Sequence, residues 1–90
     1  MTRIPFEVED AITITGRGAF VFARILGPTE WTTLQGAALG DCPIEPWTEI
    51  PRALGSDGRQ RLDLFVFQLS DAGHLSKFTR GQRVELDVKR

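Results

Sequence analysis

The sequence has little of what most metal sites and disulfide scaffolds are built from. It contains one cysteine, Cys42, and one histidine, His74, among 90 residues. A single thiol cannot close an intramolecular disulfide, and a zinc site of the usual Cys and His type would be short of ligands. The sequence therefore excludes a disulfide-stapled scaffold and disfavours a Cys/His zinc site, and we expect no cofactor.

The sequence also lacks an excess of charge of one sign. Eleven Lys and Arg residues against twelve Asp and Glu residues give a formal net charge of −1 at pH 7. Proteins that bind polyanions without specificity carry a clearly basic surface. The balance of charge therefore excludes a generic polyanion binder.

Long apolar runs are absent as well. The longest, residues 19–23, has five residues, whereas a membrane-spanning helix needs about 20. The first residues contain no apolar segment of the signal-peptide type, and acidic residues follow at positions 7, 9 and 10. We expect no membrane partner and a cytoplasmic location.

The motifs of nucleotide-dependent enzymes are also missing. No GxxxxGK(S/T) segment is present, so no phosphate-binding loop for GTP or ATP is expected. The pair Gly16 and Gly18 lacks the third glycine and the following helix of a dinucleotide-binding motif.

Paired acid–base residues are no better placed. Glu9 and Asp10 are adjacent, and adjacent side chains of a strand point to opposite faces. His74 follows Gly73 in a predicted turn, which is more typical of an exposed histidine than of a general base. We therefore expect no enzymatic activity.

What the sequence does contain is a series of short strands within one domain, residues 1–90. Glycine and proline leave apolar stretches of about five to nine residues, which favour strands over helices. Alternation predicts strands at residues 12–15 and 84–88, and denser apolar runs predict covered strands at 19–26 and 62–69. About six strands predict an all-β domain, and a closed barrel is favoured because it leaves no exposed edge.

Period-two alternation also supplies a candidate core. One face is expected to point inward and consists of Ile12, Ile14, Phe20, Phe22, Leu64, Val66, Val84 and Leu86. Phe65 and Phe67 are expected on the opposite face, beneath the loop that carries Trp47.

Turn-forming residues connect these strands. Gly16, Arg17 and Gly18 predict a hairpin turn, and residues 56–58 (Ser-Asp-Gly) predict a second turn. Residues 71–79 can form one helical turn, with Asp71 as its cap. Pro46 and Pro51 predict that any strand between them is broken, bulged or at an edge.

Two segments resemble the second domain of elongation factor Tu and related translational GTPases. Residues 5–18 (Pro-Phe-Glu-Val-Glu-Asp-Ala-Ile-Thr-Ile-Thr-Gly-Arg-Gly) match an apolar-Glu-Asp stretch, a strand and a Gly-Arg-Gly turn, and the next strand ends at Arg24. Residues 80–86 (Arg-Gly-Gln-Arg-Val-Glu-Leu) match the Arg-Gly-Gln that precedes the last strand. The two segments lie near the two ends of the chain, so the resemblance spans nearly all of it. Residues 41–50 have no counterpart in the family, and the family's GTPase domain has no counterpart in this sequence.

The resemblance implies a closed six-stranded Greek-key barrel. In the family this barrel holds the 3′ end of aminoacyl-tRNA and touches the ribosome. By position, Glu9 and Asp10 would lie near the terminal-adenosine pocket, with Gly16 to Gly18 as the neighbouring hairpin. Together with Arg17, Arg24 and Arg80, they form the expected surface for RNA or a translation component.

A protein-interaction module is the alternative. Trp31 and Trp47 are expected in polar loops flanked by Pro and Gly, not in regular strands, and exposed tryptophans are common among interface hot spots. Glu45, Trp47 and Glu49 would form an acidic, aromatic rim suited to a basic protein. The tryptophans can instead cover the open ends of the barrel, and the arginines can form ordinary surface ion pairs.

The absence of a phosphate-binding loop generates a prediction about nucleotides. Without that loop and its lysine, the chain lacks the backbone N–H groups and the positive charge that usually bind the phosphates of a nucleoside triphosphate. Calorimetric titration with the magnesium complex of GTP should give only the heat of dilution. Micromolar binding would contradict it.

Overall fold

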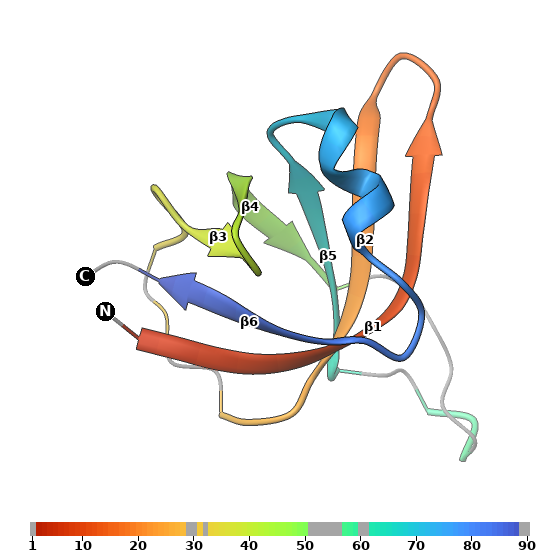
Figure 1. Cartoon of the computed structure of the whole chain (residues 1–90). Helices are drawn as coiled ribbons and strands as arrows, with labels where there is room; N and C mark the ends of the chain where they lie inside the picture. The colour runs from red at the N-terminus through yellow and green to blue at the C-terminus, as the bar shows by residue number, and fades with distance from the viewer. Residues whose placement is uncertain (1, 29–30, 32, 51–56, 60–61, 89–90) are drawn as a thin grey trace.

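Six strands form a closed barrel in the computed structural model, which describes residues 2–28, 31, 33–50, 57–59 and 62–88. The elements are β1 (Thr2–Ile14), β2 (Gly18–Ile25), β3 (Ala38–Leu39), β4 (Cys42–Glu49), β5 (Leu64–Leu69), the 3₁₀ helix η1 (Ala72–Lys77) and β6 (Arg83–Val88). All neighbours are antiparallel, in the order β1-β2-β5-β4-β3-β6 (Figure 1). The predicted all-β class, closed barrel and strand number are confirmed.

A bulge divides β1, the longest strand, into two halves. Residues 2–7 pair with β6 and residues 6–14 pair with β2, and the register with β2 shifts between Val8 and Asp10. Before the shift, Ile4, Phe6 and Val8 point into the barrel. The extra residue reverses the alternation, because successive side chains of a strand point to opposite faces.

The second half of β1 therefore presents the other set of side chains to the core. Ala11 packs against the interior, whereas Ile12 is half-buried and Ile14 is exposed. The prediction that Ile12 and Ile14 belong to the core is wrong, and the bulge is the physical reason.

The barrel interior is filled by phenylalanines packed against small residues. Phe6 and Phe67 are fully buried, with ring centroids 5.3 Å apart in an edge-to-face arrangement. Phe65 packs beside them, 6.0 Å from Phe6. β2, the strand between β1 and β5, contributes its small side chains to the same core, Ala19, Val21 and Ala23.

This assignment reverses the predicted faces of β2 and β5. Four side chains expected in the barrel interior lie instead on the outer side of the wall: Phe20, Phe22, Leu64 and Val66. Phe20, Leu64 and Val66 are nevertheless buried there, as predicted, whereas Phe22 is half-buried. Phe65 and Phe67 lie inside instead of beneath Trp47. Alternation tells which residues share a face, but both faces of these strands are apolar, so it cannot tell which face is inward. The core positions of Val84 and Leu86 are confirmed.

The β1–β2 hairpin turns at the predicted glycines. Gly16 and Gly18 have φ values of +79° and +115°, which favour glycine. The Arg17 amide donates to the carbonyl of Ile14, and Gln68 Nε2 donates to the carbonyl of Arg17 at 2.8 Å. β5 pairs with β2 only from Phe20 onward, so the tip of the hairpin extends past the end of β5 (Figure 1).

The other predicted irregularities are also seen. Asp71 caps η1 by accepting a hydrogen bond from the Gly73 amide. β4 shifts register between Ile44 and Thr48, around Pro46. Asp57 accepts from the Arg59 amide in a turn, while Pro51 and Ser56 lie outside the described residues.

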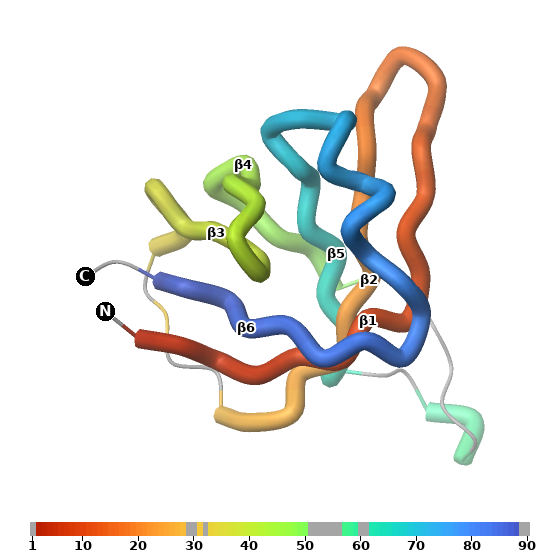
Figure 2. The backbone as a smooth tube through the Cα atoms, in the orientation of Figure 1, coloured from red at the N-terminus to blue at the C-terminus, as the bar shows by residue number. Residues whose placement is uncertain are grey.

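The barrel closes through an element that the sequence does not reveal. β3 has two residues, which pair with both β4 and β6. The two ends of the chain run side by side (Figure 2), because Thr2 pairs with Val88. The sequence patterns predict no strand at β3 or in the first half of β1, and for β4 they indicate only that any strand after Pro46 is irregular.

The reversed faces generate a stability prediction. Phe67→Ala opens a cavity in the barrel and should lower the free energy of unfolding by about 3–5 kcal/mol. Phe22→Ala, the same change on the outer face, should cost less than about 2 kcal/mol because its ring is half-buried. Denaturant titration measures both. Equal losses would contradict the assignment of Phe22 to the outside.

Candidate functional site

Apolar side chains from four neighbouring strands gather on the outside of the barrel. They are Ile14, Phe20, Phe22, Trp47 and Val66, here called the outer aromatic face. The register places Phe22, Val66 and Glu49 in one row across β2, β5 and β4. The ring centroids of Phe20 and Trp47 lie 6.2 Å apart. The Trp47 ring covers Phe20 from outside, and Phe20 is buried.

This face is partly open to solvent. Ile14 is 38% exposed, and Phe22 and Trp47 are half-buried. A shallow hollow of about 180 Å³ lies among these side chains, with Arg17 and Glu49 also at its edge. An apolar surface rimmed by charged residues is typical of an interaction site.

The bulge of β1 carries the acidic residues that the resemblance singles out. Asp10 is exposed and accepts a hydrogen bond from the Ala11 amide at 2.9 Å. Glu9 lies 3.9 Å from Arg24, and Glu7 lies 3.4 Å from the same guanidinium. Two carboxylates therefore neutralise the charge of Arg24.

The second motif of the resemblance meets the bulge directly. The Gly81 amide donates to the carbonyl of Val8, and the Val8 amide donates to the carbonyl of Gln82, both at 2.8 Å. Arg80 is exposed in this turn. The structure thus brings residues 80–82 together with the segment around Glu9.

Arg17 is placed elsewhere. It lies in the turn of the β1–β2 hairpin, beyond Gly18, whereas Arg24 lies near the other end of β2. Gly18 and Arg24 are six residue steps apart along β2, a distance of about 20 Å. Arg17 therefore belongs with the outer aromatic face, and the three predicted arginines do not form one cluster.

The two tryptophans have different surroundings. Trp31 packs against the core, with ring centroids 5.4 Å from Phe65 and 6.4 Å from Phe6. The prediction that Trp47 lies in a loop is wrong, because it belongs to β4, where its ring contacts Phe20 on the outer side of the barrel wall. Trp31 therefore has a structural contact, while Trp47 belongs to the candidate surface.

The predicted acidic rim is divided as well. Glu45 accepts a hydrogen bond from the Ser70 hydroxyl at 3.0 Å, which ties β4 to the residue after β5. Glu49 is exposed beside the outer aromatic face. Of the two glutamates, only Glu49 borders that face.

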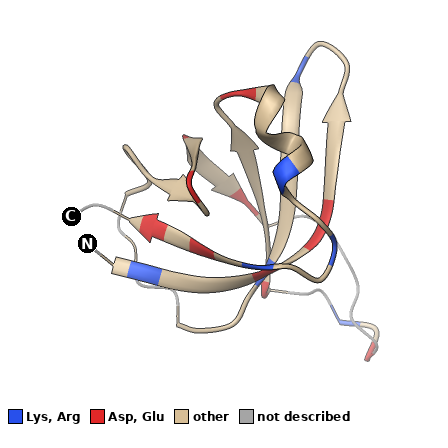
Figure 3. Cartoon of the chain, viewed as in Figure 1, with Lys and Arg blue, Asp and Glu red and all other residues tan. Residues whose placement is uncertain are grey.

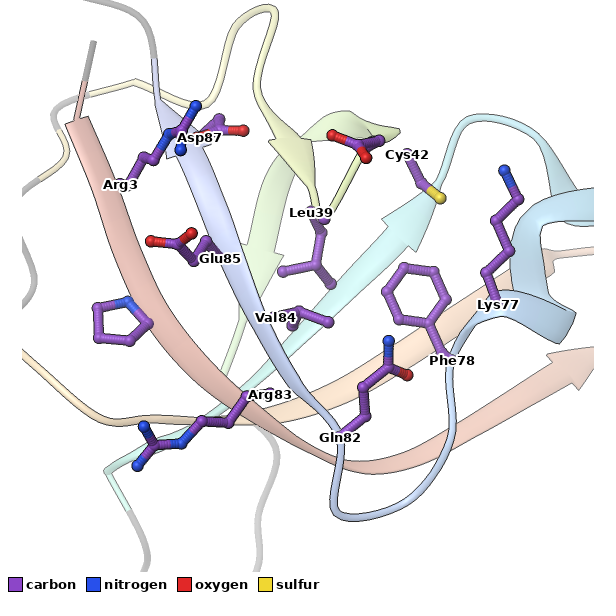
Figure 4. A pocket seen from close by; sticks show the side chains of 13 residues that line it. Arg3, Leu39, Cys42, Lys77, Phe78, Gln82, Arg83, Val84, Glu85 and Asp87 are labelled. Atoms are coloured by element: carbon purple, nitrogen blue, oxygen red, sulfur yellow. Dashed lines mark ion pairs between the residues drawn. The ribbon is translucent and has the colours of Figure 1, made fainter.

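A second concave surface lies between β6, the β3–β4 turn and η1. This groove of about 670 Å³ has an apolar floor that includes Leu39, Phe78 and Val84, which face one another across it (Figure 4). The ion pair between Arg3 and Asp87, at 3.1 Å, lies at one end. Its charged side chains are of both signs, so the groove favours no single class of ligand.

Charges of both signs are spread over the described parts of the barrel (Figure 3). His74 lies in η1 with Nε2 3.8 Å from Asp71. Within residues 2–28, 31, 33–50, 57–59 and 62–88, no three His, Cys, Asp or Glu side chains are grouped as metal ligands require. No helix in that part of the chain is long and apolar enough to cross a membrane.

Comparison of the chain with protein-family models, with curated proteins and with solved structures finds no match.

Sequence reasoning found Arg17, Trp47 and Glu49 but missed the surface that joins them. Ile14 was assigned to the core because nothing in the alternation indicates the bulge of β1. Phe20 and Phe22 were assigned to the core because both faces of β2 are apolar, so alternation cannot tell which face is inward. The groove was missed because the residues that line it come from separate parts of the chain.

The contrast between the tryptophans generates a prediction. Trp31→Ala removes contacts with two core rings and should lower the free energy of unfolding by at least about 2 kcal/mol. Trp47→Ala should cost at least about 1 kcal/mol less, because Trp47 packs on one ring outside the barrel. Thermal and denaturant unfolding test this. A larger loss for Trp47→Ala would reverse the two roles.

Proposed function

We propose that this barrel is a non-catalytic binding module whose partner is a protein, and that the outer aromatic face is its binding surface. The observation that carries the proposal is the set of partly exposed apolar side chains on the outer wall of the barrel, Ile14, Phe22 and Trp47. Adjacent, partly exposed apolar side chains with a charged rim are the kind of surface that protein partners cover.

The composition of this face fits a protein partner. Interface hot spots are enriched in Trp and Arg and are surrounded by residues that exclude water. Trp47 lies within the face and Arg17 at its edge, on a rigid sheet whose strands are held by the barrel. Little ordering is therefore required when a partner binds, which favours affinity.

A second candidate rests on the resemblance to the second domain of elongation factor Tu. In that case the barrel is of the same Greek-key type, and it contacts RNA or a translation component. The hydrogen bonds between Val8 and residues 81–82 favour this candidate, because they bring both motifs of the resemblance together. The ion pairs of Arg24 with Glu7 and Glu9 weigh against it, since RNA binding needs uncompensated positive charge.

The proposal predicts that one charge on the outer aromatic face abolishes partner binding. Ile14→Glu places a carboxylate among Phe20, Phe22 and Trp47, and should reduce capture of the protein partner at least about 30-fold. The measurement is affinity capture from the producing cells, with the captured protein identified and its affinity determined with purified components.

Thr13→Glu is the matched control. Thr13 is the exposed neighbour of Ile14 on β1, and its side chain points to the other side of the hairpin. It introduces the same charge and should leave binding unchanged. Equal losses from both variants would show that charge on the hairpin, and not the outer aromatic face, controls binding.

Filter binding with tRNA at low salt separates the two candidates. The protein-binding proposal expects no retention at tens of micromolar protein. Retention that falls steeply with salt and is lost in Arg80→Glu would instead support the RNA candidate.

A further inference from the structure

The charges at the edge of the outer aromatic face lie at its opposite corners. Arg17 is in the hairpin turn between β1 and β2, at the end of the face where Ile14 and Gly18 pair. Glu49 is on β4, two strands from β2, in the row of Val66 and Phe22. The apolar side chains of the face occupy the area between these two corners.

Both charges are available for a partner. Arg17 and Glu49 are exposed, and within the described part of the chain neither forms an ion pair. Arg24, by contrast, is already paired with two glutamates. Arg17 and Glu49 therefore supply an unpaired positive and an unpaired negative corner. Asp10 of β1, which pairs with Phe22, adds a second negative charge at the edge of the face.

Such an arrangement is complementary to itself. In a two-fold symmetric dimer, both subunits use the same surface. If residue i of one subunit contacts residue j of the other, then residue j of the first subunit also contacts residue i of the second. A two-fold axis through the middle of the face places each Arg17 against the Glu49 of the other copy. The same axis places apolar side chains on apolar side chains.

We infer that the partner of the outer aromatic face is a second copy of this chain, in an isologous dimer with two Arg17–Glu49 ion pairs. This inference rests on the proposed function and names its partner. The net charge of −1 adds little repulsion between copies, and near-neutral proteins associate readily. The β1–β2 hairpin and strands β4 and β5 form the contact.

Charge reversal tests the inference. Sedimentation equilibrium of the wild-type chain up to about 0.5 millimolar should give a mass that approaches twice the 10.0 kDa of one chain. Arg17→Glu and Glu49→Arg should each weaken the dimer at least about tenfold, because each sets like charges against one another at both contacts.

Mixing the two variants supplies the decisive result. In a heterodimer of Arg17→Glu with Glu49→Arg, one contact joins the two introduced charges and the other joins the two native ones. Both contacts then have opposite signs, so an equimolar mixture should dimerise about as well as the wild type. The double variant Arg17→Glu/Glu49→Arg should dimerise equally well alone.

Matched charge reversals away from the face are the controls. The control variants are Arg80→Glu and Glu85→Arg. Arg80 lies in the turn before β6 and Glu85 lies on β6, and both residues are exposed. Neither borders the outer aromatic face, so neither should change the association constant by more than about twofold.

Three results would overturn the inference. The first is a wild-type chain that stays monomeric. The second is a dimer whose association constant is unchanged by Arg17→Glu and by Glu49→Arg. The third is an equimolar mixture of the two variants that does not dimerise. The proposed function is judged separately. A monomeric chain that still captures a different protein through Ile14 would refute the dimer and leave the binding surface in place.

Discussion

The architecture depends on one backbone irregularity, the bulge between Val8 and Asp10 in β1. A strand of 13 residues cannot follow a small closed barrel without bending, and a bulge supplies both the bend and added twist. Val8 is held in place by backbone hydrogen bonds with Gly81 and Gln82. The turn before β6 thereby fixes where β1 leaves β6 and continues beside β2.

The bulge also creates the candidate surface. Because it reverses the alternation of β1, Ile12 and Ile14 point outward and continue the row of large side chains on β2. The interior meanwhile receives alanine and valine from β2, which leaves room for the rings of Phe6, Phe65 and Phe67. The bulge that lets the barrel close therefore adds Ile14 to the outward-facing Phe20 and Phe22 of β2, and Arg17 and Glu49 lie at the edge of this face.

Much of the barrel could be predicted from the sequence, and the candidate site could be predicted only in part. Glycine and proline spacing, the Gly16–Gly18 turn and the alternation of β6 indicated short strands, a hairpin and a closed sheet. The inward face of β2 could not be predicted, because Phe20 and Val21 lie on opposite faces and both are apolar. The choice depends on how much volume the interior holds, which is a property of the whole barrel. The charge available at Arg24 could not be predicted from the sequence either. Glu7 neutralises Arg24 only because the register of β1 with β2 places the two residues opposite one another.

Self-association of this barrel through the outer aromatic face can be followed directly on the two tryptophans of the sequence. Their indole N–H resonances can be followed in ¹H–¹⁵N spectra as the protein concentration rises from about 20 to about 500 micromolar. Trp47 lies on the outer aromatic face, so its indole resonance should shift with concentration, while that of Trp31, packed on the core, should stay in place. A shift of the Trp31 resonance alone, or no shift of Trp47 over this range, would contradict the account.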